Sequence, residues 1–201
     1  MMKEEEKLYT KELYELSHTA DAPLLEGTTY PWEALPQIGA FIRELGAGLS
    51  LEEYDHPQED VWIHKTAKVY PNNFIAGPCV IGAGTEVRPG AFIRGNALVG
   101  ENCVVGNSTE LKNVILFDNV QVPHYNYVGD SILGYKAHMG AGSITSNLKS
   151  DKTVVFISVA GEKINTGRKK LGAIVGDRVE VGCNSVLNPG TVIGRDSTLY
   201  P

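Results

Sequence analysis

Three features that would place this 201-residue sequence in other classes of protein are missing from it. No apolar run approaches the roughly 20 residues that a membrane-spanning helix needs. The three cysteines are odd in number and form no CxxC pair, which argues against a disulfide framework or a zinc ribbon. Basic residues do not prevail, since 18 Lys and Arg face 24 Asp and Glu, and the net charge of −6 argues against a general nucleic-acid binder. With no signal-peptide pattern at its charged start, the sequence predicts a cytoplasmic protein that contacts neither nucleic acid nor membrane.

A period of six residues is the strongest pattern in the sequence. Large apolar residues stand at every sixth position from Ile63 to Phe117, and the six-residue spacing resumes over 133–139 and over 175–199. Small residues stand four places after most of these apolar residues, with Cys79 and Cys103 among them. An α-helix repeats every 3.6 residues, so it cannot bury such a stripe on one face.

A coil of three short strands can bury a stripe of this period, because each hexad supplies one strand and one corner. The sequence therefore predicts an all-β fold, a parallel β-helix over residues 61–201, with Cys79 and Cys103 packed inside its corners. The phase breaks near His124 and again over about 146–172, where we expect an inserted loop. Residues 1–60 lack the hexads and carry helical spacing, so they predict a short helical cap over one open end of the β-helix.

The two interruptions are the places where function is expected, because departures from a repeat become outer loops. His124 lies at the first interruption, between Pro123 and Tyr125, and the second interruption carries many of the lysines. A neutral imidazole with a pKa near its ordinary value of about 6.5 suits a general base that takes a proton from an ammonium group. His124 is therefore the candidate catalytic histidine.

Five segments carry a resemblance to a known family: RPGAFI (88–93), GNSTELKN (106–113), HYNYVGD (124–130), GAGSITSN (140–147) and IVGDRVEVG (174–182). Together they resemble the acetyltransferase half of the bifunctional bacterial enzyme that makes UDP-N-acetylglucosamine. The sequence is still more similar to stand-alone, pyrophosphorylase-related hexapeptide-repeat proteins. The resemblance implies a left-handed β-helix, a homotrimer with active sites between subunits, acetyl-CoA as cosubstrate and glucosamine-1-phosphate or a similar amino sugar phosphate as acceptor.

The resemblance also implies roles for individual residues. In the family pattern, His124 is the base and Glu110 the carboxylate that orients it. Residues that correspond to the family's substrate-binding positions are Arg88, Lys112, Tyr127, His138, Asn147 and Lys170, with Arg88 and Lys112 on the phosphate. The acetyl-CoA contacts fall near Ala141 and Cys183. His138 replaces an asparagine of the family, which we expect to reshape the sugar pocket.

Three alternatives differ from this function in class. A sugar O-acyltransferase, or an acyltransferase on another nucleotide sugar, would use the same base. A β-helix carbonic anhydrase would need three zinc-binding histidines, but His124 and His138 are fourteen residues apart and form no close pair, so no metal site is predicted. A non-catalytic β-helix that binds a sugar nucleotide or regulates a partner nucleotidyltransferase would share the fold without the reaction.

Overall fold

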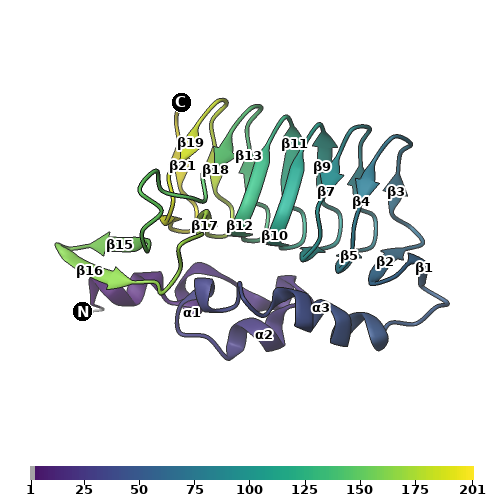
Figure 1. Cartoon of the computed structure of the whole chain (residues 1–201), viewed down its shortest axis with the longest axis horizontal. Coiled ribbons are helices and arrows are strands. Elements are labelled where there is room, and N and C mark those ends of the chain that lie inside the picture. Colours follow the sequence, from purple (N-terminus) through teal and green to yellow (C-terminus); the bar gives the residue numbers. More distant parts are fainter. Residues whose placement is uncertain (1–2) are drawn as a thin grey trace.

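A stack of short parallel strands forms most of the molecule (Figure 1), which we describe from a computed structural model covering residues 3–201. Val61 pairs with Cys79 and Cys79 pairs with Ala97, so one coil takes three hexads. Each coil hydrogen-bonds to the next along three faces. The predicted all-β fold, a parallel β-helix with a short N-terminal helical segment, is confirmed.

The strands fall into three faces around the β-helix. On the first face lie β2 (Val61–His64), β5 (Cys79–Ile81), β8 (Ala97–Val99), β17 (Ala173–Val175) and β20 (Thr191–Ile193). On the second face lie β3 (Lys68–Val69), β6 (Glu86–Val87), β9 (Val104–Asn107), β11 (Gln121–His124), β13 (His138–Met139), β18 (Glu180–Val181) and β21 (Thr198–Leu199). On the third face lie β4 (Phe74–Ile75), β7 (Phe92–Ile93), β14 (Ile144–Thr145) and β19 (Val186–Leu187). The longer strands β10 (Glu110–Leu116) and β12 (Tyr127–Leu133) run from the third face onto the first.

The interior of the β-helix is filled as the hexads predict. The large apolar residues of the repeat are mostly buried, and Cys79 and Cys103 are buried free thiols, as expected for the small corner positions. A small polar residue at such a corner is satisfied by the coil itself. The Thr85 hydroxyl donates to the Gly100 carbonyl at 2.7 Å and accepts from the Cys103 N–H at 2.9 Å, so its burial leaves no hydrogen-bonding group unpaired.

The six-residue register shifts by one position before the place that the sequence pattern indicates. Ala97 pairs with Val114, and Val114 pairs with Ser131, so each of these two coils is one position shorter than three full hexads. Leu116 therefore takes the interior position predicted for Phe117, and Phe117 packs instead on the ring of Tyr14, with centroids 4.9 Å apart. The break assigned to the surroundings of His124 begins at the corner around residue 113.

The shortened corner has a simple backbone cause. In the preceding coil, two residues with positive φ, Gly95 and Asn96, turn the chain from the third face to the first. In the next two coils a single left-handed residue makes the turn, Asn113 (φ 55) and then Asp130 (φ 49). Asn and Asp tolerate this conformation better than most residues with a side chain. Because the corner is so short, β10 and β12 continue through it as unbroken strands.

The N-terminal segment consists of short helices: η1 (Glu4–Leu8), α1 (Thr10–Leu13), η2 (Leu16–His18), α2 (Ala22–Glu26), η3 (Pro31–Glu33) and α3 (Ile38–Ala47). The sequence predicts that this segment closes an open end of the β-helix. Instead, it lies lengthwise along the first face (Figure 1). The Asp177 side chain accepts the Glu15 N–H at 2.7 Å near the last coils, whereas α3 packs on β5, β8 and β10. The N-terminal segment thus covers the apolar surface of the first face rather than an end of the β-helix.

Two further elements depart from the simple stack. Strand β1 (Tyr54–Gln58) pairs antiparallel with β2. The predicted insertion lies between Ile132 and its register partner Ile174, and it contains an antiparallel hairpin of β15 (Phe156–Val159) and β16 (Glu162–Asn165). In Figure 1 this hairpin projects beside the last coils, near the N-terminal helices. Among residues 3–201 no helix is long and apolar enough to cross a membrane.

Asp21, in the N-terminal segment, predicts how stability depends on pH. Its side chain is fully buried and Oδ1 has no hydrogen-bond partner, so burial raises the pKa from 3.8 to about 7, with Asp118 adding repulsion and a bond from Thr19 opposing the shift. Because the folded pKa exceeds the unfolded one, stability falls as pH rises from about 4 to 7 and levels off above that.

We therefore expect Asp21→Asn to stabilise the protein at pH 8 by roughly 2–4 kcal/mol and to change little at pH 4, since each pKa unit corresponds to about 1.36 kcal/mol. Urea unfolding between pH 4 and 8 measures this, with the exposed Asp55→Asn as control. Equal pH slopes for wild type and Asp21→Asn would contradict the expectation.

Candidate functional site

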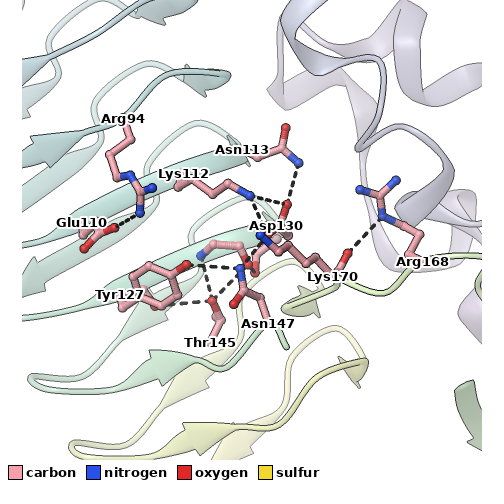
Figure 2. A network of polar contacts seen from close by, with 12 residues as sticks. Arg94, Glu110, Lys112, Asn113, Tyr127, Asp130, Thr145, Asn147, Arg168 and Lys170 are labelled. Atoms are coloured by element: carbon pink, nitrogen blue, oxygen red, sulfur yellow. Dashed lines mark hydrogen bonds and ion pairs between the residues drawn. The ribbon is translucent and has the colours of Figure 1, made fainter. Parts of the chain in front are cut away.

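A buried carboxylate organises the polar residues at the shortened corner (Figure 2). Asp130 is 2% exposed, and both its oxygens accept from Lys112 Nζ at 3.0 Å. Oδ1 also accepts from Asn113 Nδ2 at 3.0 Å and Oδ2 from Asn147 Nδ2 at 2.6 Å. A buried charge with one cationic and two amide donors is well compensated, so the corner is held rigid.

Tyr127 and Asn147 extend this network outward, as Figure 2 shows. Asn147 Nδ2 donates to the Tyr127 hydroxyl at 3.2 Å as well as to Asp130. Partial burial, followed by the charges of Asp130 and Glu110, raises the pKa of Tyr127, so the phenol stays protonated at neutral pH. Gly129 lies under the tyrosine ring, where a Cβ atom would come 2.4 Å from the hydroxyl oxygen. A side chain at position 129 would therefore displace Tyr127.

Both ends of the insertion are tied to the same corner. The Leu171 N–H donates to the Asn147 carbonyl at 3.0 Å, and the Gly172 N–H donates to the Asp130 carbonyl at 2.8 Å. Leu148 and Lys170 form an isolated antiparallel bridge, which places Lys170 beside the network. Arg168 Nε donates to the Lys170 carbonyl at 3.2 Å, and partial burial lowers the pKa of this guanidinium. The insertion thus brings cationic residues to the corner that holds Lys112, one of the two residues predicted for phosphate binding.

Glu110 has a different partner from the one predicted. Its Oε1 accepts from Arg94 Nη1 at 2.7 Å, one coil away on the same face. Glu110 pairs in register with Tyr127, three residues beyond His124, and no hydrogen bond joins it to the imidazole within residues 3–201. The role predicted for Glu110, to orient the His124 imidazole, stays a prediction. Within one chain, this role would require the carboxylate to give up its ion pair with Arg94.

His124 belongs to a separate group with the two predicted acetyl-CoA positions. The Gly142 N–H donates to the His124 carbonyl at 2.9 Å, and the Asn184 N–H donates to the Ala141 carbonyl at 2.8 Å. His124, Ala141 and Cys183 therefore occupy one register position on three successive coils, at the corner from the second face to the third. We call these three residues the corner column. His124 and Cys183 are both exposed, and coils stack at about 4.8 Å, so the column spans about 10 Å.

His138 and Arg88 lie on or near the second face, away from the Asp130 network. His138 Nδ1 lies 2.7 Å from Glu180 Oε2, and both line a polar cavity of about 300 Å³ with Asn119, Gln121 and Lys136. Arg88 Nη2 donates to Glu86 at 3.2 Å. The predicted site residues thus form two groups on one chain: the corner column with His138 and Arg88 on its second-face side, and the network of Lys112, Tyr127, Asn147 and Lys170.

The sequence reasoning did not include Asp130, Asn113, Arg94 or Arg168. Asp130 closes the quoted segment HYNYVGD, and an acidic residue after glycine at a corner could have marked it. Its lysine partner stands one coil earlier in the chain, a separation that becomes a contact only once the coil length is known. Among residues 3–201 no three His, Cys, Asp or Glu side chains gather in positions that could hold a metal ion.

Comparison with known proteins places the chain among the hexapeptide-repeat β-helix proteins. A solved structure of a hexapeptide transferase family protein from Anaplasma phagocytophilum superposes with a TM-score of 0.55 at 18% identity, covering 70% of this chain and 74% of that one, and so shares the fold. The family model described as the GMPPB C-terminal domain matches residues 75–192, more than half of the sequence. The chain belongs to this family.

Two curated relatives confirm the predicted resemblance. A protein named bifunctional protein GlmU from Methanococcus maripaludis strain C5 is 37% identical over 172 residues, covering 85% of this chain and 42% of the relative. A bifunctional sugar-1-phosphate nucleotidylyltransferase/acetyltransferase from Sulfurisphaera tokodaii is 36% identical over 141 residues, covering 70% and 35%. The chain spans less than half the length of either relative.

The Asp130 network predicts a large stability effect. Asp130→Ala removes the acceptor for Lys112, Asn113 and Asn147 together, and we expect a loss of about 2–4 kcal/mol because the amide of Asn113 stays buried without its partner. Urea unfolding measures the loss. The exposed ion pair of Asp196 with Arg178 supplies the control, since Asp196→Ala should cost less than about 1 kcal/mol. Similar losses in both variants would show that the network contributes no more than a surface ion pair.

Proposed function

We propose that this chain is an acetyl-CoA-dependent acetyltransferase that acts on an amino sugar phosphate in the cytoplasm, with His124 as its general base. The observation that carries the proposal is the corner column, in which an exposed histidine lines up with Ala141 and Cys183 along the edge of the coils. A cosubstrate lying along this edge would bring its thioester toward His124. The relatives named above support the class of reaction.

The proposed reaction uses few groups of the chain. The His124 imidazole accepts a proton from the acceptor amine as the amine nitrogen bonds to the thioester carbonyl carbon. The carbon–sulfur bond then breaks, and the coenzyme A thiolate takes the proton from the imidazolium. Beside Tyr127 and Asn147, Lys112 and Arg94 are each paired with a carboxylate, and Lys170 next to them adds the net positive charge for the acceptor phosphate.

The third face supports a homotrimer. One outward-facing column runs in register down this face, and we call it the apolar column. It consists of the apolar Phe74, Phe92, Ile144 and Val186, with Glu110 and Tyr127 between them. Phe74 and Val186 are each 56% exposed and Phe92 is 40% exposed. Large apolar side chains in such a row indicate a surface that another chain covers. Further copies of this chain there would bring cationic or carboxylate groups from a neighbour to the corner column.

Acetyl transfer can be tested directly by mixing the protein with acetyl-CoA and glucosamine-1-phosphate and following the release of free thiol. We expect His124→Ala to lower the rate by at least about 100-fold, the usual effect of losing a general base. His56→Ala is the matched control, because His56 is exposed and stacks on Trp62 far from both site groups. Comparing amino with hydroxyl acceptors separates N-acetylation from O-acetylation.

A loss of rate in His138→Ala with full activity in His124→Ala would move the base to the histidine that pairs with Glu180. No thiol release from the wild-type protein, together with no binding of acetyl-CoA by calorimetry, would contradict the acetyltransferase function.

The trimer makes a separate prediction. Phe92→Glu places a charge in the apolar column without disturbing the interior, so we expect it to convert the assembly into monomers that keep the wild-type circular dichroism spectrum. Light scattering after size-exclusion chromatography measures the mass. Leu51→Glu, at a residue 67% exposed outside the third face, should leave the trimer intact. A monomeric wild-type protein would contradict the prediction.

A further inference from the structure

A cavity of about 650 Å³ lies between the insertion and a corner of the third face. The insertion supplies most of the lining, including Phe156 and Lys163, and the coils supply Ser146, Asn188 and Pro189. Its volume lies in the range of about 300–1,000 Å³ that is usual for small-molecule sites. The proposed reaction gives no role to this cavity.

The walls of the cavity are fixed to the β-helix. Val155 and Ile157 of the insertion are buried, and a Cβ atom built on Gly190 would come 2.6 Å from Val155 Cγ1. The Gly190 N–H donates to the carbonyl of Gly172 at 2.8 Å, which joins the base of the insertion to the following coil. The hairpin therefore presents its side chains to the cavity from a supported position.

The charge and shape of the lining favour an anionic ligand with an aromatic part. The charged residues of the lining are Lys149, Lys163 and Asp151, a net charge of +1 in a chain whose total is −6. The Asp151 carboxylate in the lining accepts a hydrogen bond from the Thr153 hydroxyl at 2.8 Å and forms an ion pair with Lys149 at 3.3 Å. These interactions lower the pKa of Asp151. Within residues 3–201, the Lys163 side chain forms no ion pair or hydrogen bond, although its backbone pairs with Ser158, and Phe156 is 48% exposed.

The cavity adjoins the residues assigned to the acceptor. Ser146 and Leu148 line it, and they flank Asn147, whose amide donates to Asp130 and to the Tyr127 hydroxyl. The cavity thus begins one residue along the chain on either side of Asn147, next to the acceptor network. A sugar-1-phosphate ends near its phosphate, whereas a nucleoside diphosphate sugar carries a second phosphate and a base beyond it.

We propose that the cavity binds the nucleoside diphosphate part of the acceptor, so that the amino sugar is delivered as a nucleotide sugar. The Lys163 ammonium group donates a charge-assisted hydrogen bond to a phosphate oxygen, and the ring of Phe156 stacks on the base. The identity of the acceptor rests on the proposed acetyltransferase function. Binding of the nucleotide does not rest on it.

Calorimetry with UDP, ADP, GDP and inorganic pyrophosphate tests the binding step on the full chain. We expect at least one nucleoside diphosphate to bind at least tenfold more tightly than pyrophosphate. Lys163→Ala should weaken binding of both kinds of ligand by about tenfold, as expected for one charge-assisted hydrogen bond. Phe156→Ala should weaken only the nucleoside diphosphate. Lys169→Ala removes an exposed lysine of the same insertion that does not line the cavity, and it should change neither.

The outcomes separate this inference from the proposed function. Thiol release with glucosamine-1-phosphate, but no binding of any nucleoside diphosphate at millimolar concentration, would overturn the inference and leave the acetyltransferase intact. Equal weakening by Lys163→Ala and Lys169→Ala would also overturn it, because the attraction would then be diffuse charge alone. Nucleoside diphosphate binding that is lost in Lys163→Ala and Phe156→Ala, without acetyl transfer to any amino sugar, would support the cavity and contradict the enzyme.

Discussion

Stacking of each coil on the next through backbone hydrogen bonds is the constraint on which the rest of this molecule depends. Because a regular coil is three hexads long and its strands run parallel to those of the next coil, paired residues share a register one coil apart. Side chains that are distant in sequence therefore stack in columns, with about 4.8 Å between successive positions in a column. The corner column and the apolar column of the third face both arise from this regularity, without any loop to gather the residues.

The shortened corner shows how a small departure from the repeat creates a buried polar network. With one residue fewer at this corner in two successive coils, Asn113 and Asp130 each make the turn as a single left-handed residue, one above the other. The buried carboxylate of Asp130 would be costly there unless donors surrounded it, and Lys112 and Asn147 supply them. The same shortening carries β10 and β12 around the corner as continuous strands, so the donors stand on rigid elements.

Much of the fold could be predicted from the sequence, because the hexad period follows directly from coil geometry. Cys79 and Cys103 lie inside the corners as expected, and the insertion lies where the phase is lost. Phe117 was misassigned because an apolar residue beside the true interior residue, Leu116, conceals a one-residue slip. The helical segment was placed over an open end because helical spacing reveals an apolar stripe but not the surface that it covers.

The candidate site could be predicted less completely, for a physical reason. Sequence resemblance assigns a role to each residue separately, whereas the partners of a side chain depend on register and on rotamer. Glu110 could be identified as a conspicuous carboxylate, yet its bond to Arg94 depends on which neighbour one coil away is nearer. Asp130 contacts Lys112 from the coil before it, and its importance follows from burial, which local sequence does not show.

The N-terminal segment changes how the molecule unfolds as a whole. A solenoid held only by contacts between neighbouring coils can lose its ends independently, since each coil depends on the next. Here Glu15 bonds to Asp177 across 162 positions in sequence, while α3 of the same segment packs on early coils. The N-terminal segment thereby contacts both early and late coils, so fraying at either end of the β-helix must break some of these contacts. The segment precedes the coils in the chain but can dock fully only after the late coils exist, so we expect its contacts to form late and to join the coils into one cooperative unit.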